Sequence, residues 1–219
     1  AHFSEDPTLI EAFRQGQDIH AATAAAVYGI PLEAVTYDQR SFAKRVNFGL
    51  IYGMGAFRLA RDSDLSLEEA RAFIDTYFGR MPQVREYLDG TKARARQGAI
   101  STLFGRRRLF HTLLREAQSR VLDVQAEERV AINMPIQGSA ADIMKKAMID
   151  LHRALQASHL RAKMILQVHD ELVLEVPEAE LDETSALTVS VMENTVHLRV
   201  PLRANAQAGH NWRDMDAAR

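Results

Sequence analysis

The hydrophobic pattern of the chain changes after about residue 155, and this change restricts the folds that the sequence can adopt. Up to about residue 155, apolar residues recur mostly at helical spacing. Residues 161–177, RAKMILQVHDELVLEVP, instead place β-prone residues on both sides of a polar His-Asp-Glu, which predicts two short strands. A helix over about 178–197 and a last strand over about 202–208 follow. Helices that back a small antiparallel sheet indicate an α+β fold.

Three local signals define the helical part more closely. Ser66 and Glu69 form a capping-box pattern, so a helix should begin at this point. Another helix should end at Gly98, and the following residues 99–110, AISTLFGRRRLF, predict a basic hairpin or loop. Pro135 should interrupt the long helical stretch around it, because proline lacks the backbone N–H that a helix needs.

Composition narrows the class of protein without naming a function. A chain of 219 residues with 47% hydrophobic content can bury a real core. The formal net charge of -2 means that any binding of nucleic acid must depend on local basic clusters. With no cysteine, the chain has no disulfide or zinc-cysteine site, which fits a reducing compartment. No apolar run is long enough to span a bilayer, no signal peptide is present, and a start at Ala1 suggests an excised piece.

One predicted helix, over about residues 38–53, carries side chains suited to a nucleotide. Arg40, Lys44, Phe48 and Tyr52 follow one another at four-residue intervals and therefore share a face. Two cations stand near the helix N-terminus, where the helix dipole also favours anions, and two aromatic rings follow. This order matches the phosphates and the base of a nucleoside triphosphate. An amphipathic helix with core aromatics and a basic edge is the alternative interpretation.

Two neighbouring carboxylates lie where the two predicted strands meet. Asp170 and Glu171 can emerge together at the sheet edge, with Gln167 and His169 close by. Oxygen ligands on a rigid turn suit Mg²⁺. A two-metal site would need further carboxylates from elsewhere, and no second carboxylate motif is evident in the sequence. An ordinary polar hairpin turn is the alternative.

Two further groups could contact nucleic acid. Arg106, Arg107 and Arg108 are a dense positive cluster suited to phosphodiester contacts, although a solvated basic turn explains them as well. A second group of donors, spaced four residues apart, could reach base edges or sugars and consists of Arg129, Asn133 and Gln137. Asn133 could equally cap a helix, and His20 could be an ordinary helical histidine.

Taken in order, five segments resemble the family A DNA polymerases of the bacterial polymerase I type. These segments are DIHAATA, RSFAKRVNFGLIYGMG, TLFGRRR, AEERVAINMPIQGSAADIMKKAM and LQVHDELVLEVP. The resemblance covers nearly the whole chain. It implies a fingers subdomain over residues 1–128 and the carboxyl-terminal part of a palm subdomain over residues 129–219.

The resemblance also implies a role in nucleotide binding for the stripe. Arg40 and Lys44 would hold the triphosphate of an incoming dNTP, and Lys44 is also a candidate catalytic proton donor to the leaving pyrophosphate. Phe48 would pack on the sugar and base and disfavour dideoxynucleotides. Tyr52 would stack at the templating position until the fingers close. His20 would touch the phosphates.

The remaining residues would bind DNA and metal by the same resemblance. Primer-template DNA would contact Arg106, Arg107, Arg108, Arg129, Asn133, Gln137 and His169. Asp170 matches a catalytic metal ligand, and Glu171 is a supporting carboxylate. Two Mg²⁺ ions, or Mn²⁺ as an alternative, would assist attack of the primer 3'-hydroxyl on the α-phosphate. Such a protein would be cytoplasmic, associated with the bacterial nucleoid and without a membrane anchor.

The chain departs from the family pattern in four respects. Motif A, DYSxIELR, carries the other metal-binding aspartate and is absent, as is the thumb. We therefore expect the chain to need a polymerase portion with motif A and the thumb, and to be inactive alone. Arg45 stands where the family more often has a small residue, and the loop after Arg108 lacks an expected proline.

Three interpretations of function therefore stay open. The first is part of a DNA polymerase, either excised or half of a split enzyme. The second is a noncatalytic module that binds nucleotide or nucleic acid. The third is a metal-dependent phosphohydrolase that uses His169 and Asp170, although no further His or Asp motif completes such a site.

Overall fold

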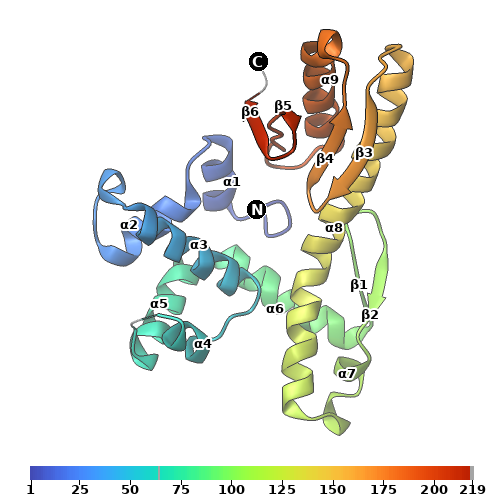
Figure 1. Ribbon diagram of the computed structural model, residues 1–219. Helices are drawn as coiled ribbons and strands as arrows, with labels where there is room; N and C mark the ends of the chain where they lie inside the picture. Colours follow the sequence, from blue (N-terminus) through green and yellow to red (C-terminus); the bar gives the residue numbers. More distant parts are fainter. Residues whose placement is uncertain (64, 218–219) are drawn as a thin grey trace. The chain divides into compact units, whose positions relative to one another are not determined.

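The computed structural model describes residues 1–63 and 65–217 and divides the chain into two compact units (Figure 1). The first unit comprises Ala1–Ile136 and the second comprises Gln137–Arg219. The functional division at residues 128 and 129 concerns fingers and palm roles and stays a prediction.

The first unit is mostly helical. Its elements in chain order are α1 (Pro7–Arg14), α2 (Ile19–Tyr28), the 3₁₀ turn η1 (Leu32–Ala34), α3 (Tyr37–Ile51), α4 (Ala56–Arg61), α5 (Leu67–Arg80), α6 (Pro82–Gln97), β1 (Ala99–Ser101), β2 (Arg107–Leu109), α7 (His111–Leu114) and η2 (Glu116–Gln118). The helix α8 (Val121–Ala157) begins in this unit and ends in the second.

Side-chain caps fix where several of these helices begin. Ser66 accepts a hydrogen bond from the backbone N–H of Glu69, whose carboxylate accepts one from the N–H of Ser66, which confirms the predicted capping box. Thr36 and Gln39 form a second capping box at the start of α3. The prediction that α6 ends before Gly98 is also confirmed.

Two apolar clusters hold the first unit together. The larger one joins α3, α4, α5 and α6 around fully buried residues such as Leu50, Leu59 and Ile132. The smaller one surrounds Phe110 and Ile100 and anchors the base of the β1–β2 hairpin. Because both clusters include residues of α8, burial of apolar surface fixes this helix against the elements before it.

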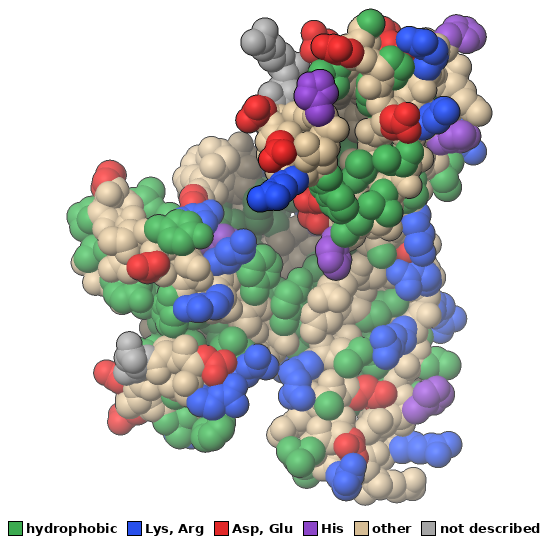
Figure 2. Space-filling view, in the orientation of Figure 1, with side chains coloured by type: hydrophobic (Ala, Val, Ile, Leu, Met, Phe, Trp, Pro, Cys, Tyr) green, Lys and Arg blue, Asp and Glu red, His purple; other side chains and the backbone are tan. Residues whose placement is uncertain are grey.

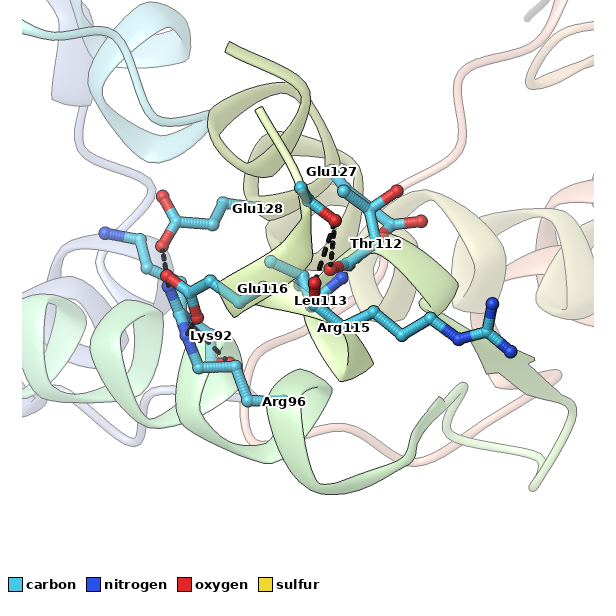
Figure 3. Close-up of polar contacts among 9 residues, drawn as sticks. Lys92, Arg96, Thr112, Leu113, Arg115, Glu116, Glu127 and Glu128 are labelled. Atoms are coloured by element: carbon cyan, nitrogen blue, oxygen red, sulfur yellow. Dashed lines mark hydrogen bonds and ion pairs between the residues drawn. The ribbon is translucent and has the colours of Figure 1, made fainter. Parts of the chain in front are cut away.

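An ion-pair network reinforces the second cluster (Figure 3). Arg96 of α6 bonds through Nε to Glu116 at 2.6 Å and through Nη2 to Glu128 of α8 at 2.6 Å. Glu127 accepts a hydrogen bond from the backbone N–H of Leu113 in α7 at 2.7 Å. One guanidinium and two neighbouring glutamates therefore tie α6 and α7 to the first turns of α8.

The predicted basic hairpin is present in the first unit. β1 and β2 pair antiparallel, with Ile100 opposite Arg108. The turn is closed by a hydrogen bond from the N–H of Thr102 to the carbonyl of Arg106, and Gly105 adopts φ +82°. A positive φ favours glycine, so the Gly that precedes the arginines is the residue that allows this tight turn.

The second unit contains the end of α8 and two separate hairpins. β3 (Lys163–Val168) pairs antiparallel with β4 (Glu171–Glu175), which confirms the predicted strands that meet at the His-Asp-Glu segment. The 3₁₀ turn η3 (Glu178–Glu180) and α9 (Leu181–Asn194) follow, close to the predicted helix. A small core around Leu151 and Leu155 packs α8 against α9 and β4. The α+β fold class is confirmed.

Two sequence-based predictions of secondary structure were wrong. Pro135 does not interrupt the helix, because α8 runs continuously through it. Burial of Ile132 and Met134 just before the proline compensates for the one missing N–H donor. The last strand does not span 202–208; β5 (Gln207–Asn211) pairs instead with β6 (Asp214–Ala217). The Asn211 side chain accepts hydrogen bonds from the N–H groups of Arg213 and Asp214, which sets the turn further along the chain.

Candidate nucleotide and nucleic-acid site

The predicted stripe lies on α3, and the structure brings most of it together. Arg40, Lys44 and Phe48 are within the helix, and Tyr52 is its C-cap residue. The rings of Phe48 and Tyr52 stack with centroids 6.2 Å apart and an interplanar angle of 21°. The helix ends at Ile51, two residues before the predicted end, because Gly53 takes φ +83° and the N–H of Met54 bonds to the carbonyl of Gly49.

A cavity of about 550 Å³ adjoins this face of α3. Its lining includes Arg40, Phe48 and Tyr52 from α3 together with His20 from the first turn of α2. The rings of His20 and Phe48 have centroids 5.6 Å apart. His20 is therefore a member of the same site as the stripe, even though it lies far from Phe48 in sequence.

An ion pair links the cationic end of the stripe to α2. Asp18 caps α2 by accepting hydrogen bonds from the N–H groups of His20 and Ala21, both at 3.0 Å, and it also accepts one from Nε of Arg40. Partial burial alone would raise the pKa of Asp18, but the bond and charge of Arg40 and the two N–H donors hold that pKa below its usual value. Arg40 is thus held at the rim of the cavity before any ligand binds.

The imidazole of His20 is kept neutral by its surroundings. Burial lowers the pKa of His20, the carboxylate of Asp18 opposes this, and the charges of Arg40 and Lys44 lower the pKa further. The lowered pKa of His20 favours the uncharged ring at neutral pH. The positive charges near His20 are those of Arg40, which lines the cavity, and of Lys44, which is not among the lining residues.

A second cavity, of about 880 Å³, lies along the C-terminal half of α3 and α4. Phe48 and Tyr52 line it as well, so the two stacked rings border both cavities. Its charged lining residues are Asp62, which pairs with Arg58 at 3.4 Å, and three arginines: Arg45, Arg58 and Arg129. The guanidinium of Arg45 lies 6.0 Å from the centroid of the Phe42 ring, within range of a cation–π contact.

The predicted DNA-contacting residues fall at separate places. Arg106 is in the hairpin turn, and Arg107 and Arg108 are exposed on β2, with the Arg108 guanidinium 5.7 Å from the Phe110 ring. Asn133 donates a hydrogen bond to the carbonyl of Arg129 at 2.7 Å, within α8. Gln137 belongs to the second unit. Acidic and basic side chains are interspersed on the face shown in Figure 2, so positive charge is local, as the net charge indicated.

The carboxylate pair lies at the turn between β3 and β4. Asp170 follows His169, which adopts φ 53°, and Glu171 is the first residue of β4, paired with Val168. The side chain of Gln167 donates a hydrogen bond to the carbonyl of His169 at 2.6 Å. Both carboxylates are exposed and lie on adjacent residues, and their oxygen atoms are suitable ligands for a hard cation such as Mg²⁺. Within residues 1–63 and 65–217, no group of three His, Cys, Asp or Glu side chains is arranged to hold a metal.

Sequence reasoning missed several residues of the nucleotide site. Asp18, Thr23 and Asn47 all bond to residues of the site. A signal existed for Asp18, because an Asp two residues before His20 is a typical N-cap. Asn47 stands at a buried position of α3, and only the folded structure shows its partners.

The fold and this site are those of a mostly helical protein with a face suited to a nucleotide, and the comparisons with known proteins identify the family. Residues 1–214 match the model of DNA polymerase family A. The chain belongs to this family. In the part of the chain that the structure describes, no helix has the length and apolar character needed to cross a membrane.

Proteins from several bacteria are similar to this chain in sequence. DNA polymerase I of Caldicellulosiruptor bescii is 48% identical to this chain; the match covers 97% of this chain and 25% of the relative. DNA polymerase I of Pseudomonas aeruginosa is 49% identical, and that match covers 97% of this chain and 23% of the relative. The chain thus spans about a quarter of the length of the curated relatives it matches.

A solved structure is similar over the same region. It is the POL domain of Pol1 from M. smegmatis in complex with DNA primer-template and dNTP. This structure is 43% identical, has a TM-score of 0.87, and is matched over 93% of this chain and 35% of that one. The match confirms that the chain corresponds to part of a polymerase domain.

Proposed function

We propose that this chain supplies the dNTP-binding face and part of the metal site for template-directed DNA synthesis. The observation that carries the proposal is the α3 face, where Arg40, Phe48, Tyr52 and His20 line one cavity. Cations stand at one end and stacked rings at the other, as the phosphates and base of a nucleotide require. Membership in DNA polymerase family A, and a similar structure with primer-template and dNTP bound, support the same function.

Each residue of the face has a defined part in this proposal. Arg40 and Lys44 bind the triphosphate, and His20 donates a hydrogen bond to it. Arg40 must exchange its bond to Asp18 for the phosphates, so nucleotide binding competes with an existing ion pair. Phe48 packs on the sugar and base and disfavours dideoxynucleotides, and Tyr52 occupies the templating position until the fingers close.

The reaction is nucleotidyl transfer. The primer 3'-oxygen attacks the α-phosphorus of the dNTP, the bond from that phosphorus to the bridging oxygen breaks, and pyrophosphate leaves. Lys44 gives its proton to the leaving pyrophosphate. Asp170, supported by Glu171, would hold Mg²⁺, or Mn²⁺ as an alternative, which would supply Lewis-acid chemistry for the attacking hydroxyl and the phosphate charge. His169, Arg129, Asn133, Gln137 and Arg106–Arg108 contact primer-template DNA.

We infer that a polymerase portion carrying motif A and the thumb completes this site. Asp170 and Glu171 are adjacent on one turn, and two-metal catalysis needs carboxylates from more than one segment. The 219 residues alone should therefore bind dNTP without extending a primer. The same result is expected whether the chain is an excised polymerase fragment or half of a split enzyme.

Titration of the 219-residue chain with dATP tests the binding face directly. We expect saturable binding that Arg40→Ala weakens about tenfold or more, since a hydrogen bond to a charged group contributes roughly 1.5–3 kcal/mol. Arg80→Ala, at an exposed position at the end of α5, is the matched control and should bind as the unchanged chain does. Equal loss of affinity in both variants, or no saturable binding by the unchanged chain, would refute the proposed role of α3.

A further inference from the structure

Asn47 is a buried polar residue beside the proposed nucleotide face. It lies in α3 immediately before Phe48, and only 2% of its surface is exposed. A buried amide needs hydrogen-bond partners, because leaving it unpaired costs roughly 1–3 kcal/mol. Asn47 finds its partners on α2, and one of them is the ring of His20.

The contacts of Asn47 form a closed group with α2. Its amide nitrogen Nδ2 lies 3.0 Å from Nδ1 of His20 and 3.0 Å from Oγ1 of Thr23. The Thr23 hydroxyl lies 3.1 Å from Oδ1 of Asn47 and 2.9 Å from the carbonyl of Ile19, to which it donates within α2. Both hydrogens of the amide are thus directed at two fixed residues of one helix.

The orientation of the Asn47 amide favours one protonation site on the His20 ring. With Nδ2 of Asn47 beside the ring, Nδ1 of His20 is the acceptor, because an amide NH₂ group only donates hydrogen bonds. In a neutral imidazole the proton then resides on Nε2, which lies on the part of the ring away from Asn47. His20 also lines the nucleotide cavity, so Nε2–H is the donor that the ring can offer to a ligand.

We propose that Asn47 is a positioning residue that holds His20 in the Nε2–H tautomer, so that a neutral imidazole offers one N–H donor to the triphosphate. The role in nucleotide binding rests on the function proposed above; the tautomer itself does not. With Nδ1 bonded to a donor, protonation of that nitrogen would require loss of the bond to Asn47. Asn47 and the cations of α3 therefore act together to keep His20 uncharged.

The charged neighbours of His20 explain why a neutral donor is useful at this place. Arg40 and Lys44 of α3 already supply two positive charges, and Asp18 at the start of α2 is paired with Arg40. Burial raises the pKa of Tyr77 and of Tyr87, which line the same cavity, so both hydroxyls stay uncharged. A third cation would be repelled by the first two, whereas an oriented N–H can bond to phosphate oxygen with little pH dependence.

Nitrogen-15 NMR of the 219-residue chain without nucleotide tests the tautomer. The His20 ring signals are assigned from their loss in His20→Gln. At neutral pH we expect Nδ1 to give the signal of an unprotonated nitrogen and Nε2 that of a protonated one. In Asn47→Asp the carboxylate can only accept, so Nδ1 should become protonated and the pKa of His20 should rise. A protonated Nδ1 in the unchanged chain would overturn the proposal without any use of variants.

A double-mutant cycle with dATP binding tests the positioning role. We expect Asn47→Leu to weaken binding about fivefold, in line with loss of one oriented hydrogen bond, and to have almost no effect in a chain that already carries His20→Gln. Asn194→Leu is the matched control, because the side chain of Asn194 in α9 bonds within its own helix to the carbonyl of Ser190. If Asn47→Leu weakens binding equally with and without His20→Gln, its role is merely structural and the proposal is overturned.

The two experiments separate failure of this inference from failure of the proposed function. If the chain does not bind dATP, the nucleotide role of both His20 and Asn47 is refuted, while the NMR spectrum still decides the tautomer. If the chain binds dATP and Nδ1 is protonated, the proposed function stands and the role of Asn47 is wrong. Circular dichroism of each variant confirms that the helices are intact before either result is used.

Discussion

The nucleotide face of α3 and the carboxylate turn between β3 and β4 differ in how completely the chain builds them. The α3 face has a buried amide, an ion pair to α2 and stacked rings that border two cavities. The two carboxylates of the turn are exposed. Asp170 lies after the six-residue strand β3, and Glu171 is the first residue of the five-residue strand β4. Under the proposed function, this difference means that the chain organises the nucleotide-binding face more completely than the metal site.

The largest effect should come from the carboxylate turn once motif A is supplied. Asp170→Asn removes a metal-binding charge, so primer extension by the chain mixed with a portion carrying motif A should fall by about a thousandfold or more. Asp182→Asn, an exposed acidic residue in the first turn of α9, should leave extension unchanged. Extension that survives in Asp170→Asn would show that the metal is held elsewhere.

The cationic end of α3 should give the next largest effect. Lys44→Ala removes the proposed phosphate contact and the proposed proton donor, so kcat of the mixed enzyme should fall by about a hundredfold or more. Lys44→Arg keeps the charge and should restore affinity for dNTP more than it restores kcat. Lys92→Ala, whose side chain pairs with Asp89 on α6, serves as the control. A change in KM alone for Lys44→Ala would remove the proton-donor role.

The stability of the α3 end can be tested at Gly53. Alanine there would adopt φ +83° and place its Cβ 3.4 Å from Cγ of Arg129 and Cδ1 of Ile132. The left-handed conformation alone costs about 1–2 kcal/mol, so the free energy of unfolding should fall by about that amount. Gly55→Ala is the matched control, since a Cβ there meets open space and the backbone φ is -89°. Equal loss of stability in both variants, measured by urea denaturation, would contradict this reading of the helix end.

A smaller effect is expected from the basic hairpin. Arg107→Gln removes one exposed cation from β2, so affinity for primer-template DNA should fall a few fold and the slope of log K against log salt should lessen by about 1. Arg80→Gln at the end of α5 tests whether any exposed arginine behaves in the same way. An unchanged salt slope in Arg107→Gln would mean that β2 does not contact phosphates.

The smallest effect concerns pH and the Asp18–Arg40 pair. Because folding lowers the pKa of Asp18 below 3.8, its contribution to stability is present above that value and is lost as the pH falls through the folded pKa. The lowered pKa of His20 acts in the same direction, because protonation from pH 6.5 downward favours the unfolded chain. Asp18→Asn keeps the cap and loses the exposed ion pair, so we expect a loss of about 0.5 kcal/mol at neutral pH that vanishes in acid. Thermal melts between about pH 3 and pH 8 provide the check.

Local patterns account for most of what the sequence predicted correctly. The Ser66 cap, the β1–β2 hairpin and the strands on either side of His169–Glu171 all depend on residues within a few positions of one another. The four-residue stripe likewise placed Arg40, Phe48 and Tyr52 on one face from helix geometry alone. The family resemblance is confirmed, while the individual catalytic and DNA-binding roles stay predictions.

The wrong or missing predictions involve contacts between distant segments. Nothing near Pro135 in sequence shows that burial of its neighbours carries α8 through it. The C-terminal strand was misplaced because its position depends on a partner, β6, and on the turn bonds of Asn211. The bond between Asn47 and His20 spans 27 residues, so periodicity within either helix gives no sign of it.

The central claim is that the chain has a complete nucleotide-binding face and an incomplete metal site. Primer extension tests it, with the 219-residue chain assayed alone and mixed with a portion carrying motif A and the thumb. Asp170→Asn in the mixture controls for contaminating polymerase. We predict no extension by the chain alone, extension by the mixture, and loss of that extension with Asp170→Asn. Robust extension by the chain alone would contradict the claim that its binding face is complete while its metal site is not.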